Sequence, residues 1–384
     1  MLQTTELDYE LPESSIATVP ASPRDSARLM VVHRATGAVD HLLIRDLPDL
    51  LAPTDLLVRN CTSVLPARFC GVRTDTGGKV EGLYLSDEPG IAEGHRCRVL
   101  LKMRRHKPGA AIALTTPDGQ PSGYRLVLEA RAGASDSPAP DEIPTDSGWI
   151  VRIESDTGDS ARWLDAVGLT PLPPYILAAR KKLDLHIAEP EDRAAYQTVF
   201  AAEPVDAAAR PEHGSVAAPT AGLHFTPELL ARIAGRGVQT ADVILHVGMG
   251  TFKPVETEFV EHHPMHTEWC MVPAESARRI REAKSTGGRV IAIGTTAART
   301  LESFTDPAEM ERLSARSTRL LITPGYRWKT VDALLTNFHL PRSTLMAMVS
   351  ALLPGGPAQL RSLYAEALQR GYRFYSFGDA MLVL

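Results

Sequence analysis

The sequence predicts a layered α/β domain that carries a small, inserted all-β barrel. Helix-like and strand-like patterns alternate from residue 214 to the C-terminus, which is typical of an α/β domain. Short runs of alternating polarity, separated by Gly, Pro and Asp turns, begin near residue 66 and are typical of a small barrel. Because α/β patterns occur on both sides of this β-rich region, we assign residues 1–65 and 166–384 to the α/β domain and 66–165 to the barrel.

The first 65 residues are expected to begin the α/β domain. Residues 7–19 are predicted to dock on the body of the protein as an irregular N-terminal segment. A Thr-Gly turn between two apolar runs favours a hairpin after that segment. The predicted elements are strands at 27–33 and 39–44, a short helix from residue 44 and a strand at 55–60.

The inserted region is expected to hold six strands, because each of six short runs alternates between apolar and polar residues. Turns such as Lys107-Pro-Gly separate these runs. Residues 132–148 are poor in large apolar side chains and are predicted to form a loop. The strands are expected at 67–72, 78–85, 96–101, 111–114, 124–130 and 149–153.

The region after the barrel returns to helix and strand patterns. A helix is predicted to begin at Thr226-Pro227, where an N-cap residue precedes a first-turn proline, and to end at Gly235 or Gly237. A loop is expected at 203–214. The other predicted helices lie at 192–202, 273–284, 297–304, 343–353 and 357–369, and the strands at 243–247, 289–293, 320–323 and 373–377.

Composition and charge exclude several classes of protein. No apolar run reaches the roughly 18 residues that a membrane helix needs, and the N-terminus lacks the basic and apolar regions of a signal peptide. Four scattered cysteines without a CxxC pair indicate a reducing cytoplasm. The net charge of −5 argues against sequence-blind nucleic-acid binding, although local basic patches at 102–107 and 180–182 remain open.

A histidine-rich stretch, HHPMHTE at 262–268, raises the question of a metal site. Histidines four residues apart on a helix share a face and can bind one metal ion. Pro264 argues against a regular helix in this stretch, and no second set of ligands is evident. We therefore expect no metal. The common nucleotide-binding and hydrolase motifs also find no match in the sequence.

Four polar loops next to predicted strands hold the candidate functional residues, at 218–225, 246–251, 294–299 and 336–343. Ligands of open α/β sheets bind at the carboxyl ends of strands. Gly294-Thr295-Thr296 follows a strand and precedes a helix, so its backbone amides can bind a carboxylate or phosphate. The alternatives are an ordinary turn at this place, an N-cap role for Ser343 and a hydrogen-bonded core position for His246.

Motifs spread over nearly the whole chain, from residue 8 onwards, together resemble those of one enzyme family. They include DYELPESSIA (8–17), LPARFCG (65–71), PLPPYI (171–176), GSVAAPTAGLHFT (214–226), LHVGMGTFKPV (245–255), MHTEW (265–269), RVIAIGTTAARTLES (289–303), LLTNFHLPRSTLMAMVSA (334–351) and YRFYSFGDAML (372–382). The chain thus resembles the S-adenosylmethionine:tRNA ribosyltransferase-isomerases of queuosine biosynthesis.

This resemblance implies a reaction and a set of partners. Such enzymes act on tRNA that carries 7-aminomethyl-7-deazaguanine at the wobble position. They move the ribosyl part of S-adenosylmethionine to the aminomethyl nitrogen and rearrange it, which gives epoxyqueuosine-tRNA and releases adenine and methionine. The resemblance also implies an α/β domain with an inserted β-barrel, a cytoplasmic monomer and no metal.

The reaction requires particular residue types, which the matching motifs supply. The sulfonium acidifies the C5′ hydrogens of the ribosyl group, so a histidine or carboxylate is expected to remove one of them. The candidate catalytic residues, expected to converge on one pocket, are His224, His246, His266, Glu268 and His339. The candidate substrate-binding residues are Thr220, Gly222, Gly248, Gly250, Thr251, Gly294, Thr295, Thr296, Arg299, Asn337 and Ser343. The candidate tRNA contacts are Arg68, Lys79, Tyr175, Lys253 and Arg342.

One segment departs from the family pattern and keeps two alternatives open. After LLV the family commonly has Asn-Asn-Thr-Arg, whereas residues 59–63 here are Arg-Asn-Cys-Thr-Ser. If this segment contacts tRNA, the acceptor can differ, for instance a free 7-deazapurine. A non-catalytic protein that binds S-adenosylmethionine or RNA is the second alternative.

Overall fold

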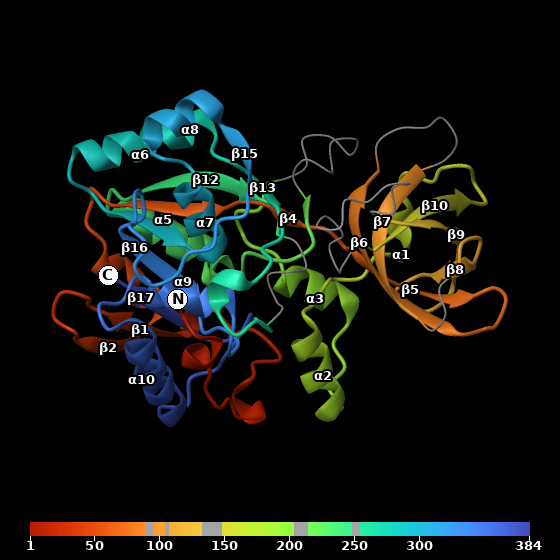
Figure 1. Cartoon of the computed structure of the whole chain (residues 1–384), viewed down its shortest axis with the longest axis horizontal. Helices are drawn as coiled ribbons and strands as arrows, with labels where there is room; N and C mark the ends of the chain where they lie inside the picture. The colour runs from red at the N-terminus through yellow and green to blue at the C-terminus, as the bar shows by residue number, and fades with distance from the viewer. Residues whose placement is uncertain (89–94, 104–106, 133–147, 203–213, 248–253) are drawn as a thin grey trace.

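The structure is a computed structural model of the 384-residue chain. It describes all residues except 89–94, 104–106, 133–147, 203–213 and 248–253. A nine-stranded sheet covered by helices stands beside a closed six-stranded barrel (Figure 1). The predicted fold class is therefore confirmed. Most of the loops predicted at 132–148 and 203–214 lie outside the described residues.

The large sheet gathers the carboxyl ends of its central strands at one edge. Its central strands β12, β3, β14 and β16 all run parallel. The strand β17 runs antiparallel to β16, so the residues that precede β17 lie at the same edge. In order across the sheet the strands are β15 (Ala315–Thr318), β13 (Glu268–Met271), β12 (Gln239–Leu245), β3 (Leu56–Asn60), β14 (Val290–Ile293), β16 (Ala333–Asn337), β17 (Ala380–Val383), β1 (Arg28–Val32) and β2 (Val39–Leu43).

Both faces of the sheet are buried, because successive side chains of a strand point to opposite faces. In β14, Val290 and Ala292 join one apolar cluster, whereas Ile291 and Ile293 join the other. The first cluster is covered by α6 (Ala274–Ser285), α7 (Thr295–Glu302), α8 (Pro307–Leu313), α9 (Thr344–Ser350) and α10 (Gly356–Gln369). The second is covered by α5 (Pro227–Gly235) and a 3₁₀ helix (Ile44–Leu50).

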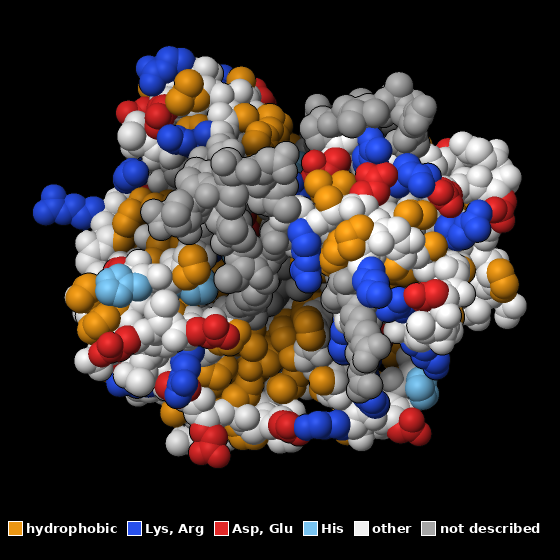
Figure 2. Space-filling view, turned by 45° about the vertical axis from the view of Figure 1, so that its right-hand side comes forward, with side chains coloured by type: hydrophobic (Ala, Val, Ile, Leu, Met, Phe, Trp, Pro, Cys, Tyr) orange, Lys and Arg blue, Asp and Glu red, His pale blue; other side chains and the backbone are white. Residues whose placement is uncertain are grey.

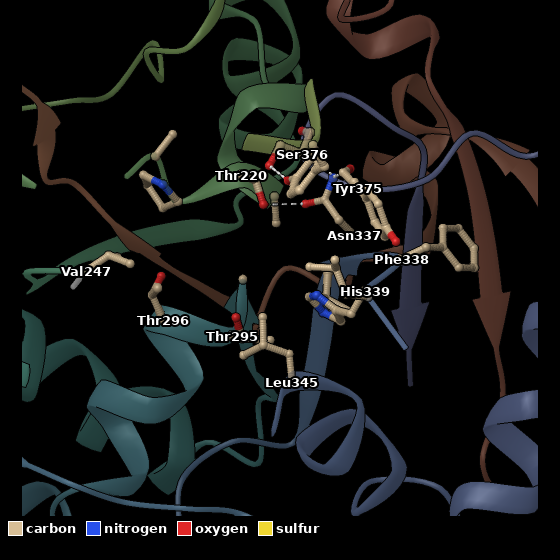
Figure 3. A pocket seen from close by; sticks show the side chains of 17 residues that line it. Thr220, Val247, Thr295, Thr296, Asn337, Phe338, His339, Leu345, Tyr375 and Ser376 are labelled. Carbon is tan, nitrogen blue, oxygen red and sulfur yellow. Dashed lines mark hydrogen bonds between the residues drawn. The ribbon is translucent and has the colours of Figure 1, made fainter. Parts of the chain in front are cut away.

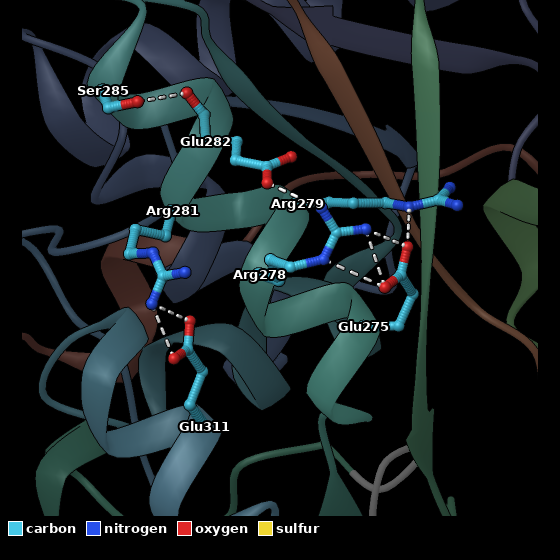
Figure 4. Close-up of polar contacts among 7 residues, drawn as sticks. All are labelled: Glu275, Arg278, Arg279, Arg281, Glu282, Ser285 and Glu311. Atoms are coloured by element: carbon cyan, nitrogen blue, oxygen red, sulfur yellow. Dashed lines mark hydrogen bonds and ion pairs between the residues drawn. The ribbon is translucent and has the colours of Figure 1, made fainter.

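The helix starts follow from local sequence. The Thr226 side chain accepts a hydrogen bond from the Leu229 amide, as predicted for an N-cap before Pro227. The outer face of α6 is charged, with Glu275 paired to Arg278 and Arg279 one turn away, and Arg281 reaches Glu311 of α8 (Figure 4). Its opposite face is buried in the core, and the helix predicted at 273–284 is confirmed.

The barrel holds all six predicted strands, in the order β10-β7-β6-β5-β8-β9. Trp163 of α1 (Trp163–Val167) packs against Phe69 in the barrel core, with ring centroids 5.3 Å apart. The boundary that we place between residues 165 and 166 stays a prediction, and α1 spans it. The strands are β5 (Arg68–Arg73), β6 (Lys79–Asp87), β7 (His95–Lys102), β8 (Ala111–Thr115), β9 (Pro121–Arg131) and β10 (Trp149–Ser155).

Short elements connect the barrel and the sheet. The helices α2 (Pro174–Lys182) and α3 (Glu189–Ala195) lie between the two in Figure 1. The two-residue strands β4 (Ser63–Val64) and β11 (Gly214–Ser215) pair with each other. The N-terminal segment docks as predicted, since Ile16 pairs with Phe374 and packs against the core. In the described part of the chain, no helix has both the length and the apolar character needed to cross a membrane.

The strand predicted at 320–323 is wrong. The strand here is β15, which ends at Thr318 and pairs with β13 through its backbone. Ile322 lies in the core beneath the helices, so the apolar character of this run reflects packing and not strand pairing.

The strand predicted at 373–377 is also wrong, because Tyr375 has a φ of +73° and interrupts any extended run. The last strand is β17, a few residues later. The helix predicted at 192–202 begins earlier, as α3, and ends at Ala195. The predicted set lacks α1, α2, α8, β4, β11, β13 and β16. In β16 the polar pair Thr336-Asn337 obscures the apolar pattern.

Candidate active site

A pocket opens at the edge of the sheet where β14 and β16 end (Figure 3). Parallel strands of an α/β sheet commonly bind ligands at this edge. The walls of the pocket also include residues next to β12 and before β17. The start of a 3₁₀ helix (Thr220–His224) and the first turn of α2 complete them. Seven of the predicted site residues line it: Tyr175, Thr220, Gly294, Thr295, Thr296, Asn337 and His339.

The N-terminus of α7 forms one wall of the pocket. Gly294 has a φ of +90°, a conformation that favours glycine, and it turns the chain from β14 directly into the helix. The first amides of a helix have no partner within that helix. The Thr296 hydroxyl is buried and forms no hydrogen bond with any described residue. This corner of the pocket therefore offers several unused donors to an anionic group.

Asn337 joins three segments of the pocket wall. Its side-chain oxygen accepts a hydrogen bond from the Thr220 hydroxyl at 2.9 Å (Figure 3). Its Nδ2 donates to the carbonyl of Tyr375 at 3.1 Å and lies 3.4 Å from Nε2 of His224. The amide thereby fixes the 3₁₀ helix and the chain before β17 relative to β16.

His339 is held at three atoms. Its amide donates to the Tyr364 hydroxyl at 3.0 Å, and its carbonyl accepts from the Tyr9 hydroxyl at 2.5 Å. Its Nε2 lies 2.7 Å from the Thr336 hydroxyl. Burial lowers the pKa of His339 to about 3, because the charged form loses its hydration. The imidazole in the pocket is therefore neutral at physiological pH.

His224 lies behind the pocket wall and does not line the pocket. It is buried, and its Nε2 faces the amide of Asn337. Burial lowers its pKa to about 3, with further contributions from Arg373 and Arg24. It is therefore a neutral side chain that touches a pocket residue.

His246 and His266 also lie outside the pocket lining. The ring of His246 stacks on Trp269 with centroids 5.0 Å apart, and its neighbour Val247 takes the place in the wall. His266 is half-buried just before β13. Of the five candidate catalytic residues expected to converge on one pocket, His339 lines it, whereas His224, His246, His266 and Glu268 do not.

Glu268 and Arg299 form a buried ion pair with each other. Oε2 of Glu268 lies 2.8 Å from Nη1 of Arg299, and the two side chains are 5% and 6% exposed. From the sequence, Glu268 is expected to act as a base and Arg299 to bind a substrate carboxylate. The two side chains instead neutralise each other. They connect β13 to α7, outside the pocket lining.

The remaining predicted substrate residues have structural positions or lie outside the described residues. The Ser343 hydroxyl caps α9 by accepting from the Met346 amide, which confirms the N-cap alternative. A Cβ on Gly222 would stand 2.7 Å from Cζ of Phe200, so glycine is needed there for packing. Gly248, Gly250 and Thr251 lie outside the described residues.

The predicted tRNA contacts are spread over the molecule. Arg68 and Lys79 lie on the barrel strands β5 and β6. On the right-hand side of the view in Figure 2, basic and acidic side chains are mixed. Arg342 pairs with Asp8, with 2.8 Å between Nε and Oδ2. Tyr175 lies in the pocket, where its hydroxyl bonds to Ser376. Lys253 lies outside the described residues.

The departing segment at 59–63 is largely internal. The Asn60 side chain donates to the Leu245 carbonyl at 3.1 Å and accepts from the Thr62 hydroxyl at 3.0 Å. Cys61 is also buried. The side chains of Asn60 and Thr62 therefore tie β3 to the end of β12.

Sequence reasoning missed several residues that shape the pocket. They are Thr336, Tyr375, Ser376, Tyr9 and Tyr364. Four of them, all except Tyr364, lie within the matched motifs DYELPESSIA, LLTNFHLPRSTLMAMVSA and YRFYSFGDAML, which could have drawn attention to them. Their contacts are not visible in the sequence. No group of three potential metal ligands occurs among the residues that the structure describes.

Acid is expected to destabilise the fold through His224 and His339. Their folded-state pKa values of about 3 lie below the ordinary 6.5, so their stabilising contribution is complete above pH 6.5 and is lost as the pH falls towards 3. Each histidine should lower the unfolding free energy by up to about 1.4 kcal/mol per pH unit in that window. Urea unfolding of the parent and of His339→Gln between pH 7.5 and 5 measures this. Identical pH dependence in the two proteins would contradict it.

Comparison with known proteins gives one consistent result. The sequence profile described as "Queuosine biosynthesis protein" matches residues 4–383. A protein from Symbiobacterium thermophilum named S-adenosylmethionine:tRNA ribosyltransferase-isomerase is 44% identical over 384 residues, which is 100% of both chains. A protein of the same name from Gloeobacter violaceus is 44% identical over 99% of this chain and 96% of its own. The solved structure of an S-adenosylmethionine tRNA ribosyltransferase from Thermotoga maritima matches with a TM-score of 0.50 and 32% identity, over 99% of this chain and 100% of that one.

Proposed function

The chain belongs to the queuosine biosynthesis protein family, and from this premise we infer that it is an enzyme of tRNA modification, an S-adenosylmethionine:tRNA ribosyltransferase-isomerase. It transfers the ribosyl group of S-adenosylmethionine to 7-aminomethyl-7-deazaguanine in tRNA and isomerises it to the epoxycyclopentane of epoxyqueuosine. Adenine and methionine are released. Its substrates are accordingly S-adenosylmethionine and tRNA.

The pocket beside α7 is the proposed site for S-adenosylmethionine. The observation that carries this assignment is the combination, in one cavity, of a helix N-terminus with an unpartnered Thr296 hydroxyl and a neutral imidazole at His339. The helix amides and the hydroxyl suit the methionine carboxylate. We therefore assign carboxylate binding to the α7 amides and the Thr296 hydroxyl in place of Arg299, because the Arg299 guanidinium is already paired with Glu268.

His339 is the proposed general base because, of the candidate catalytic residues, it is the one that lines the pocket; its pKa of about 3 makes the imidazole a weak base, so the proposal rests on its position and not on its basicity. If its Nε2–H donates to Thr336, Nδ1 is left as the acceptor for a C5′ proton of the ribosyl group. The C–H electron pair remains as a carbanion, which the neighbouring sulfonium stabilises. Two hydroxyl groups hold the backbone of His339, so the ring needs little reorganisation before the transfer.

Candidate tRNA contacts outside the pocket stay proposals. They are Arg68, Lys79, Lys253 and Arg342. A tRNA substrate suggests the cytoplasm as the location of the enzyme, and a monomer stays the proposed state of assembly. A free 7-deazapurine is the less favoured acceptor, because Asn60, Cys61 and Thr62 in the departing segment are internal.

One assay tests the function. The enzyme is incubated with S-adenosylmethionine and either precursor-bearing tRNA or free 7-aminomethyl-7-deazaguanine, and adenine is followed by mass spectrometry. Adenine released with the tRNA, together with a tRNA mass increase matching the ribosyl group, is expected. Release with the free base alone would move the assignment to the alternative acceptor. No adenine with either acceptor would refute both enzymatic assignments.

A further inference from the structure

Tyr375 has a backbone conformation that a tyrosine rarely adopts. Its φ of +73° lies in the left-handed region, where a Cβ crowds the backbone and glycine is favoured. Such strain persists only where the surrounding structure enforces it, and it clusters at sites of function. The residue lines the pocket just before β17.

Three backbone contacts hold Tyr375 in this conformation. Its amide donates to the Phe338 carbonyl at 3.1 Å. Its carbonyl accepts from Nδ2 of Asn337 at 3.1 Å and from the Gly378 amide at 2.9 Å. The Asn337 amide is in turn oriented by Thr220, as Figure 3 shows. The strained turn is therefore supported from β16 and from the 3₁₀ helix.

The turn places an aromatic pair in the pocket wall. The rings of Tyr375 and Tyr175 have centroids 4.6 Å apart and planes inclined by 56°. The Tyr175 hydroxyl bonds to Ser376, which fixes the second ring. No described residue forms a hydrogen bond with the hydroxyl of Tyr375. The hydroxyl thus contributes no bond that would account for the strained backbone, and the residue lines the pocket beside Tyr175.

We propose that Tyr375, supported by Tyr175, is a substrate-positioning residue whose ring packs against the adenine of S-adenosylmethionine. The assignment rests on the proposed function and deepens it. Aromatic side chains stack on the faces of flat heteroaromatic rings, and this stacking does not depend on the polar groups at the ring edges. Tyr375 is only 7% exposed, which suits a small substrate that enters the pocket whole. The unpartnered donors at the start of α7 line the same cavity, where they are placed to bind the methionine end of S-adenosylmethionine.

The left-handed backbone permits a test that separates binding from folding. Tyr375→Gly removes the ring and relieves the backbone strain, which offsets part of the packing lost with a buried side chain, so binding is measured below the thermal midpoint of the variant. Tyr375→Phe keeps the ring and is the matched control. Calorimetric titration with S-adenosylmethionine, without tRNA, should show affinity weakened about 10-fold or more in Tyr375→Gly and within about threefold of the parent in Tyr375→Phe. The affinity for free adenine, measured as a competitor of S-adenosylmethionine, should fall by a similar factor in Tyr375→Gly.

The outcomes distinguish this proposal from the function on which it rests. Adenine release by the parent enzyme with precursor-bearing tRNA tests the function alone. If the parent is active and Tyr375→Gly binds S-adenosylmethionine as the parent does, the positioning role is refuted and the function stands. An increase in KM for tRNA alone, or a loss of thermal stability without a change in S-adenosylmethionine affinity, would likewise refute it.

Discussion

Replacing His339 by glutamine is expected to lower the rate of adenine release by about 100-fold or more, the usual contribution of a positioned general base. Glutamine keeps a polar side chain of similar reach but cannot accept a proton at neutral pH. The substitution leaves the two backbone hydrogen bonds of residue 339 available, since they do not involve the ring. Single-turnover kinetics with saturating S-adenosylmethionine and tRNA measure the effect on the chemical step.

A matched histidine and a supporting residue serve as controls. His33→Gln changes a histidine that pairs with Asp40 in the β1–β2 hairpin, outside the pocket lining, and should leave the rate unaltered. Thr336→Val removes the group that orients Nε2 of His339 and should reduce the rate by a smaller factor than His339→Gln. If His339→Gln retains more than a tenth of the parent rate, His339 is not the base.

Replacing Glu268 by alanine is expected to destabilise the fold by about 3–5 kcal/mol, the usual cost of removing one partner of a buried ion pair. The loss leaves the Arg299 guanidinium, which is 6% exposed, without its carboxylate. Urea unfolding followed by circular dichroism, at constant pH, gives the change in free energy.

Two further variants separate the charge effect from the loss of packing. The double variant Glu268→Leu/Arg299→Met removes both charges and should recover most of the lost stability, because no buried charge remains unpaired. Glu275→Ala removes an exposed carboxylate that also pairs with arginines (Figure 4) and should change stability little. A Glu268→Ala variant as stable as Glu275→Ala would show that the buried pair contributes nothing.

The assignment of Glu268 to ion pairing also bears on the chemistry. The Glu268 carboxylate pairs with Arg299 outside the pocket lining, so it is not placed to touch a substrate in the pocket. A catalytic effect of Glu268→Ala should therefore follow the loss of folded protein. Activity measured per folded molecule is expected to remain much nearer to the parent value than in His339→Gln.

The sequence alone determined the two-part fold, because the patterns on which that prediction rests are local. A period of two along a strand and caps at a helix start depend on neighbouring residues, so all six barrel strands and the start of α5 are predicted correctly. It also located much of the pocket. The turn after β14 carries small or polar residues, and the end of β16 carries the polar pair Thr336-Asn337, where a core strand would carry apolar ones.

Only the tertiary structure decided which polar groups are available for chemistry. Glu268 and Arg299 are far apart in sequence, and their pairing depends on how β13 and α7 pack. The left-handed turn at Tyr375 is imposed by contacts from β16, which no local pattern encodes. A motif identifies residues that share a site, but burial and partners set by distant segments decide which of them keeps a free donor or acceptor.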